Sequence, residues 1–371
     1  MSSVVKVKDI AYINPKSNIK RFEYIHYIET SSVYDGSLLS TQFLDHDYPS
    51  RAQRELSQGD ILISSVRPCL KHNYLVKVNL DNLVGSSGFI QIRRKSSQYL
   101  EQYLYYFLTS EKNIAHYDIV ANFSQTAFPT FNKDLIEELV LPNISLEEQH
   151  HIVNTIGSVD DLIENYQQEI DKICELLDKS LLQFPNRVEI SSYNPKIIKS
   201  GIESFFNSKE YLDTSSVEGV NNISVGEKIT ISKRPSRANM QPVKNSVWFA
   251  KMKGSCKKLI ITADDSDLTN HYILSTGFQG LLATKELPLS LLSAFVISKD
   301  FDVQRDLNSV GTTMAGINNE TFMKMLVPQL SAQEIEKFDK KYSPLVKLLS
   351  QRRKKIAKLK TIKQQLLQKY F

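Results

Sequence analysis

The segment Leu141-Pro-Asn-Ile-Ser-Leu-Glu-Glu-Gln-His-His-Ile152 marks the start of a long helix. Ser145 and Glu148 have the spacing of a capping box, in which the hydroxyl and the carboxylate bind free backbone N–H groups at the helix start. Apolar residues then follow in alternating steps of four and three: Ile152, Ile156, Val159, Ile163, Tyr166, Ile170, Ile173 and Leu177. This heptad seam predicts a helix over residues 144–185 that packs against a partner helix.

The end of the chain carries the same device. Pro328 precedes Ser331-Ala-Gln-Glu334, which repeats the capping-box spacing. A second seam follows and is interrupted at Arg352 and Lys363; its apolar members are Phe338, Tyr342, Leu345, Leu349, Ile356, Leu359, Leu366 and Tyr370. The pattern predicts a second long helix over residues 330–371.

Short motifs recur in the same order along the chain, at offsets that drift by only a few residues. They pair Tyr27–Val33 with Tyr211–Val217, Pro49–Ala52 with Pro235–Ala238, Ser86–Phe89 with Ser275–Phe278, and Leu141-Pro142 with Val327-Pro328. We infer that the chain is two copies of one unit of about 186 residues.

Each copy begins with a part that mixes short β-rich runs, turns and helices. Ile61–Val66 and Leu259–Thr262 are examples of such runs, bounded by Gly, Asp, Asn and Pro. The predicted fold class is therefore α+β: two tandem mixed α/β domains, over residues 1–143 and 186–329, each followed by a long helix.

The two predicted helices carry opposite charge. The first is rich in acids between Glu147 and Asp178, whereas residues 351–371 contain eight basic residues and no acid. We expect the two helices to pair within the chain as an antiparallel coiled coil, with the opposite charges favouring the pairing. The alternatives are that each helix packs on its own domain or drives dimerisation.

Composition excludes several classes of protein. The 371 residues have a net charge of +5, 41% hydrophobic residues and three cysteines without a CxxC pair. These values are typical of a folded protein of two or three domains in a reducing cytosol, so we expect a cytoplasmic location. No apolar run is long enough to span a membrane, and the first residues do not resemble a signal peptide.

The sequence offers no catalytic motif. It contains no GxxxxGK[ST], GxGxxG or HExxH pattern, and Asn14-Pro15-Lys16 has lysine where an amino-methyltransferase motif needs a second proline. We therefore expect no catalytic residue, no metal site and no cofactor in this chain.

Six stretches, three in each half of the chain, together resemble a known family. Leu56–Pro68, Ser86–Phe89 and Leu141–Ile152 look like one half of the DNA-specificity subunit of type I restriction-modification systems, and Trp248–Lys253, Ser275–Phe278 and Leu366–Phe371 look like the other half. The second helix start departs from the pattern, because Glu334-Ile335 stands where the first copy has Glu148-Gln149.

The resemblance implies a non-catalytic subunit. Each α/β domain would be a target recognition domain that reads one half of a bipartite double-stranded DNA sequence, and the helices would set the unread gap. The family also implies two modification subunits that methylate adenine with S-adenosylmethionine, and a restriction subunit. S-adenosylmethionine, ATP and Mg would belong to those partners.

Basic residues next to turns are the best candidates for DNA contact, because arginine binds both guanine and phosphate. The candidates are Arg51, Arg67 and Lys71 in the first copy, and Arg237, Lys251, Lys253, Lys257 and Lys258 in the second. Arg51 and Arg237 are kept in both copies, so they could instead hold the fold.

Two other classes of function stay open at the level of sequence. The chain could be a DNA-acting enzyme in its own right, such as a nuclease, or a coiled-coil scaffold that binds protein only. Salt-dependent DNA binding by the assembled complex would separate the last of these from a specificity subunit.

Overall fold

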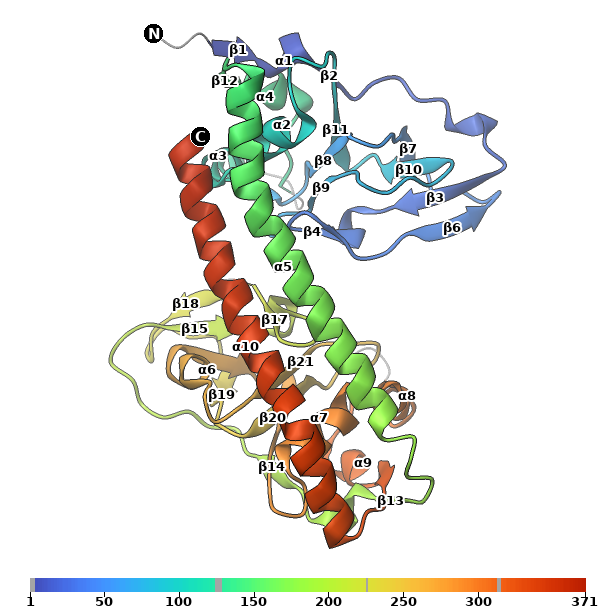
Figure 1. Cartoon of the computed structure of the whole chain (residues 1–371), viewed down its shortest axis with the longest axis vertical. Coiled ribbons are helices and arrows are strands. Elements are labelled where there is room, and N and C mark those ends of the chain that lie inside the picture. The colour runs from blue at the N-terminus through green and yellow to red at the C-terminus, as the bar shows by residue number, and fades with distance from the viewer. Residues whose placement is uncertain (1–3, 124–128, 225, 312–314) are drawn as a thin grey trace. The chain divides into compact units, whose positions relative to one another are not determined.

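The structure is a computed structural model that describes residues 4–123, 129–224, 226–311 and 315–371. The chain divides into two compact units. Unit 1 comprises residues 1–161 and 359–371, and unit 2 comprises residues 162–358. The long helices α5 (Leu146–Ser180) and α10 (Ala332–Tyr370) each contribute to both units (Figure 1).

Unit 1 contains two four-stranded sheets. Their strands are β2 (Ala11–Ile13), β3 (Tyr24–Ile28), β6 (Gln42–Asp45), β7 (Ala52–Glu55), β8 (Ile61–Ser64), β9 (Asn73–Leu75), β10 (Leu83–Ser86) and β11 (Phe89–Arg94). One sheet has the order β6-β3-β10-β7, in which only the β3–β10 pair is parallel. The other is antiparallel with the order β2-β11-β8-β9.

Unit 2 repeats this topology strand for strand. Its strands are β14 (Lys196–Ile198), β15 (Lys209–Leu212), β18 (Glu227–Ile229), β19 (Ala238–Met240), β20 (Ser246–Ala250), β21 (Lys258–Ile261), β22 (Tyr272–Ser275) and β23 (Phe278–Leu282). The sheets have the orders β18-β15-β22-β19 and β14-β23-β20-β21, and β15 and β22 form the parallel pair. The duplication inferred from short motifs thus extends to the strand order of both sheets.

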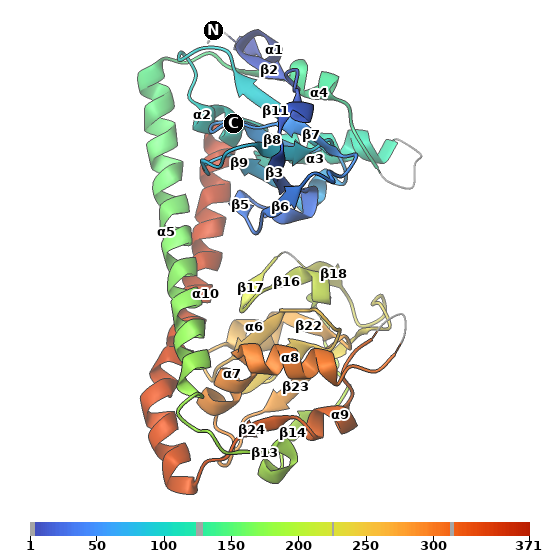
Figure 2. The same ribbon diagram turned by 90° about the vertical axis from the view of Figure 1, so that its right-hand side faces the viewer.

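Smaller pairs and short helices complete each unit. The pairs are β1 (Val4–Lys6) with β12 (Val140–Pro142), β4 (Val33–Tyr34) with β5 (Ser37–Leu38), β13 (Arg187–Glu189) with β24 (Leu326–Pro328), and β16 (Val217–Glu218) with β17 (Asn222–Ile223). The short helices are α1 (Val7–Ile10), α2 (Glu101–Leu108), α3 (Glu111–Phe123) and α4 (Lys133–Glu137) in unit 1, and α6 (Ser266–His271), α7 (Leu289–Ile297), α8 (Lys299–Leu307) and α9 (Asn319–Met323) in unit 2 (Figure 2).

Both long helices begin where the capping boxes predict. The Ser145 backbone N–H donates to Glu148 Oε2 over 3.0 Å, and the Glu148 N–H donates to Ser145 Oγ over 3.2 Å. In the second copy the Ser331 N–H donates to Glu334 Oε2 over 2.7 Å, and the Glu334 N–H donates to Ser331 Oγ over 3.4 Å. The reciprocal bonds satisfy backbone donors that the first turn leaves free.

The helices pair in antiparallel fashion in each unit. In unit 1 the His151 and Tyr370 rings lie 6.4 Å apart, and Lys363 Nζ lies 2.7 Å from Asp160 Oδ1. In unit 2 Lys355 Nζ lies 5.0 Å from the centre of the Tyr166 ring. Position numbers rise along α5 as they fall along α10, so the predicted antiparallel pairing and the α+β fold class are confirmed.

The charged interruptions of the second seam have a structural reason. Arg352 pairs with Glu169, and Lys363 pairs with Asp160, both of which lie on the acidic helix α5. Each cation thus occupies a seam position because it faces an acid across the pair. These two ion pairs provide the expected attraction between the helices. The neighbouring Arg353 and Lys354 instead contact Asp265, which lies outside both long helices.

A buried ion pair fastens α10 to unit 2. Asp265 is fully buried; its Oδ1 lies 2.7 Å from Arg353 Nη2 and accepts a 2.5 Å hydrogen bond from Ser350 Oγ. Thr262 donates to the other carboxylate oxygen through both its backbone N–H and its hydroxyl. Burial opposes ionisation, but these donors and the charge of Arg353 outweigh it and lower the pKa of Asp265 to about 2.

Unit 1 uses an uncharged anchor at the start of α5. Gln149 is fully buried; its Oε1 accepts from the Leu100 N–H over 2.9 Å, and its Nε2 donates to the Gln98 carbonyl over 3.0 Å. Tyr106 adds a 2.8 Å hydrogen bond from its hydroxyl to Asp160 Oδ2.

None of the helices in the described part of the chain is long and apolar enough to cross a membrane.

The substitution Asp265→Asn should lower the free energy of unfolding of unit 2 by about 3 kcal/mol at neutral pH, because it leaves Arg353 buried without its full countercharge. The folded pKa of Asp265 is about 2 and lies below the unfolded value of 3.8. The stabilisation is therefore present above about pH 4 and lost as the pH falls towards 2. Urea denaturation should show a difference between wild type and D265N that narrows over this range.

The matched control is Glu336→Gln, which removes an exposed acid from α10. It should leave the free energy of unfolding unchanged at neutral pH and as the pH falls towards 2. A D265N variant as stable as wild type at neutral pH would contradict the role given to the ion pair.

Candidate DNA-binding framework

Three of the repeated sequence motifs meet at one place in unit 1. The Pro49–Ala52 segment forms a turn in which the Ala52 N–H donates to the Pro49 carbonyl over 2.8 Å. The Arg51 carbonyl accepts from the Ser87 N–H over 2.6 Å, and the Gly88 N–H donates to Ser86 Oγ over 3.2 Å. The turn before β7 is thereby tied to the turn between β10 and β11.

Unit 2 reproduces these bonds. The Ala238 N–H donates to the Pro235 carbonyl over 2.9 Å, and the Thr276 N–H donates to the Arg237 carbonyl over 2.8 Å. The Gly277 N–H donates to Ser275 Oγ over 3.1 Å. We call the two turns with their arginine and glycine the arginine framework: Arg51 with Ser86–Gly88 in unit 1, and Arg237 with Ser275–Gly277 in unit 2.

The glycine of the framework leaves room for the arginine. A Cβ atom at Gly88 would lie 3.1 Å from Arg51 Nη2 and 2.9 Å from Thr30 Cγ2, and one at Gly277 would lie 3.4 Å from Arg237 Nη2 and 2.9 Å from Thr214 Cγ2. The threonines belong to the third repeated motif. Each guanidinium therefore lies next to a glycine backbone while the residue as a whole stays exposed.

Neither framework arginine forms an ion pair with an acid among the described residues. Their guanidinium groups are thus positioned by the fold but keep their charge available to an anion. This geometry is compatible with both readings of the repeat, contact with DNA and support of the turn.

Arg67 and Lys71 flank the short turn Pro68–Leu70 that follows β8. Both have a left-handed backbone, with φ of 46° and 52°, which is uncommon for residues other than glycine. The Arg67 N–H donates to the Pro129 carbonyl over 3.1 Å, so this loop is fixed on the same side of unit 1 as Ser65, which bonds to Gly88. Arg67 is exposed and Lys71 is half-buried.

The four candidate lysines of unit 2 fall into different environments. Lys251 is half-buried beside Arg237, and burial followed by the charge of Arg237 lowers its pKa. Lys253 is exposed. Lys257 Nζ lies 3.8 Å from Glu218, whereas Lys258 is 3% exposed and its Nζ lies 2.8 Å from Asp302. The structure brings Lys251 to the framework arginine and gives Lys258 a place in the core.

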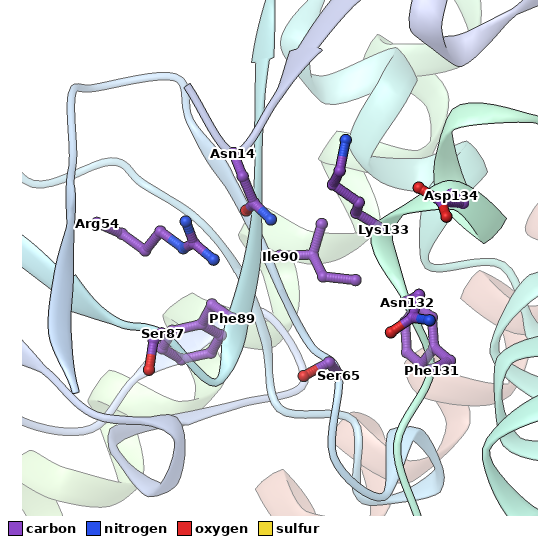
Figure 3. Close-up of a pocket in the computed structure, with 10 residues that line it drawn as sticks. All are labelled: Asn14, Arg54, Ser65, Ser87, Phe89, Ile90, Phe131, Asn132, Lys133 and Asp134. Carbon is purple, nitrogen blue, oxygen red and sulfur yellow. The ribbon is translucent and has the colours of Figure 1, made fainter. Parts of the chain in front are cut away.

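Sequence reasoning missed Arg54. Its side chain is half-buried, and its Nε has no hydrogen-bond partner in the structure. It lines a pocket of about 330 Å³ with Asn14, Ser65 and Lys133 (Figure 3). The signal that could have found it is a difference between the copies, because the residue at the same offset of 186 is Met240.

The three cysteines differ in exposure. Cys69 and Cys256 are exposed, and burial raises the pKa of Cys174 to about 12, so this thiol stays protonated. Within the described ranges, no group of three or more His, Cys, Asp or Glu side chains is placed to hold a metal ion.

Two comparisons with known proteins each match less than half of the chain. Residues 2–175 match the model of the family described as "Type I restriction modification DNA specificity domain". A segment of 170 residues is 28% identical to the Type I restriction enzyme HindI specificity subunit of Haemophilus influenzae, and covers 43% of this chain and 37% of that protein. The matched region thus spans little more than a third of the curated relative.

Solved structures of similar proteins cover nearly the whole chain. The HsdS subunit from Thermoanaerobacter tengcongensis is 16% identical, with a TM-score of 0.42 over 100% of this chain and 96% of that one. The type I restriction-modification S subunit from M. genitalium is 14% identical, with a TM-score of 0.48 over the same shares of the two chains.

The fold defines a class of proteins built from two copies of an α+β unit and two paired helices. Residues 2–175 match the model of the type I restriction modification DNA specificity domain family. The resemblance recognised from the sequence is confirmed.

Proposed function

We propose that this chain is the sequence-specificity subunit of a type I restriction-modification complex and reads a bipartite DNA target. The observation that carries the proposal is the arginine framework, which recurs in both units although most of the sequence around it has diverged. The family match over residues 2–175 supports this proposal, and the identical strand order of unit 2 extends it to the second half.

The framework suits contact with the DNA backbone. Arg51 and Arg237 are exposed, held beside glycine, and not neutralised by an acid among the described residues. Phosphate contacts are independent of sequence and fix the register of a protein on the duplex, so both units can use the same residue for them. Lys251, half-buried beside Arg237, and the exposed Arg67 and Lys253 lie on the neighbouring loops after β8 and β20 and are not counted among these backbone contacts.

The loops after β8 and β20 are the parts suited to base reading. They begin at the framework, since the Ser65 N–H donates to the Gly88 carbonyl and the Lys251 N–H donates to the Gly277 carbonyl, both over 2.9 Å. Their side chains differ between the units, as two readers of different half-sites require. Lys71 and Lys257 stand at the far ends of these loops, whereas Lys258, with its ion pair to Asp302, is left out of the proposed DNA contacts.

The chain itself is proposed to be non-catalytic. Two modification subunits would supply adenine N6-methylation with S-adenosylmethionine, and a restriction subunit would supply ATP- and Mg-dependent cleavage. The paired helices α5 and α10 would carry the docking surface for these partners. At ~1.5 Å per residue, their 35 and 39 residues give lengths of about 53 and 59 Å, compared with about 34 Å for one turn of DNA.

Co-expression with the cognate modification subunit, in a host that lacks other adenine methylation, tests this function. Long-read mapping should find N6-methyladenine at one bipartite motif with a constant gap. A genome without a new motif, or with one continuous motif, would contradict the proposal. A protein-only scaffold predicts the first of these contrary results.

The substitutions Arg51→Ala and Arg237→Ala, made separately in the assembled complex, should weaken binding to every DNA sequence to a similar degree. Each should also reduce the slope of log affinity against log salt concentration by about 1, because one phosphate contact is lost. Fluorescence anisotropy at several salt concentrations measures both quantities.

Lys112→Ala is the matched control, since it removes an exposed cation from α3. It should leave affinity and salt slope as in wild type. If R51A and R237A bind DNA as wild type does but melt at lower temperature, the arginines support the turn and the assignment of phosphate contact is wrong.

A further inference from the structure

The two units differ in charge at two positions beside the arginine framework. The first position is on the edge strand, β7 in unit 1 and β19 in unit 2. In β7, Ala52 is paired with Ser86 and Arg54 with Gly85; in β19, Ala238 is paired with Ser275 and Met240 with Leu274. In both units the strand register shifts between these two pairs. Arg54 and Met240 therefore occupy equivalent positions of the fold.

The second position is the first residue of the loop after the central strand. Ser65 and Lys251 each donate a backbone N–H to the framework glycine carbonyl over 2.9 Å. Their carbonyls also accept equivalent bonds, from the Phe131 N–H over 3.2 Å and from the Ile317 N–H over 2.9 Å. These backbone contacts establish that Ser65 and Lys251 are equivalent.

The exchange of charge between the two positions is reciprocal. Unit 1 has a cation on the strand, Arg54, and an uncharged residue in the loop, Ser65. Unit 2 has an uncharged residue on the strand, Met240, and a cation in the loop, Lys251. Each unit thus places one additional cation beside a framework arginine, from a different element of the same scaffold.

Neither additional cation is neutralised by the described part of the protein. Arg54 is half-buried with an unpartnered Nε, and Lys251 is half-buried next to another cation. Partial burial of a charge without a partner costs free energy, and an acceptor from a ligand at the terminal guanidinium nitrogens of Arg54 or at the Lys251 ammonium would recover part of it. Figure 3 shows Arg54 at the edge of the pocket that Asn14 and Ser65 also line.

We propose that the residue pair at these two positions, Arg54 with Ser65 in unit 1 and Met240 with Lys251 in unit 2, selects the base pair that each unit binds beside its framework arginine. This inference rests on the proposed function. In unit 1 the acceptor for Arg54 is a guanine edge, whose O6 and N7 match the two donors of a guanidinium.

The pattern of change between the units favours base reading over backbone contact. A phosphate contact serves any sequence, so there is no reason for its residue to change when the target changes. The framework arginine is kept in both units, whereas the strand and loop positions beside it have exchanged their charge. A residue that reads a base is expected to differ between two units that bind different half-sites.

The test uses the substitution Arg54→Met in the full chain, assembled with its modification subunits. Binding to a library with randomised half-sites should lose a preference of roughly 5- to 150-fold at one base pair of one half-site, as for a lost bidentate contact. The other half-site and the gap should be unchanged. The converse variant Lys251→Ser should alter only the other half-site.

Two further variants guard against effects on folding or on charge alone. Lys112→Met removes an exposed cation of α3 and should leave both half-sites unchanged. Arg54→Lys keeps the charge but not the planar pair of donors, so it should relax the same base preference while retaining non-specific affinity. Met240 shows that this position of the fold accepts methionine, and the melting temperature of R54M checks it.

The inference is overturned if R54M and R54K keep the base preference of wild type, whether or not overall affinity falls with a smaller salt slope. That result would make Arg54 a phosphate contact or a structural residue. Failure of the proposed function looks different, because the wild-type complex would then show no bipartite preference at all.

Discussion

The buried ion pair between Asp265 and Arg353 joins α10 to the rest of unit 2, beside the apolar core that Phe338, Val346 and Leu349 of α10 enter. It joins the loop between β21 and α6 to the middle of α10, where Ser350 and Arg353 project from one face of the helix. Two charges that are removed from water are stable only when hydrogen bonds replace the lost water. Thr262 and Ser350 donate those hydrogen bonds to the Asp265 carboxylate. In unit 1 the neutral side chain of Gln149 fastens the start of α5. The two copies thus solve the same attachment with different chemistry and at different points of their helices.

Much of this architecture could be predicted from the sequence, because it depends on local and periodic signals. The capping boxes at Ser145 and Ser331 placed both helix starts within two residues of the observed ones. The seam from Ile152 to Leu177 identified a packed helix face, and the opposite charges of the two helices predicted their pairing. The partners of individual basic residues could not be predicted in this way. Arg352 and Arg353 are neighbours in sequence, yet one binds the acidic helix and the other a buried aspartate 88 positions away.

Some residues of the candidate site could also be predicted from the sequence and others could not. Repetition identified Arg51 and Arg237 because identical turns were kept in both copies. It did not identify Arg54, since a residue that differs between the copies leaves no repeated motif; the difference from Met240 gains meaning only with the strand register and the unpartnered nitrogen. Lys258 looked like its exposed neighbours in sequence, but the pairing of Lys258 with Phe249 places it on a fully buried strand beside Asp302. The net charge of +5 was a poor guide, because much of the basic excess lies on a helix that pairs with acids.

We propose that one scaffold, present twice, reads two independent half-sites through residues beside a common arginine framework. The decisive experiment replaces residues 186–329 with the equivalent part of another specificity subunit and maps methylation by the assembled complex. One half of the bipartite motif should change while the other half and the gap stay as they were. A change in both halves, or in neither, would contradict it.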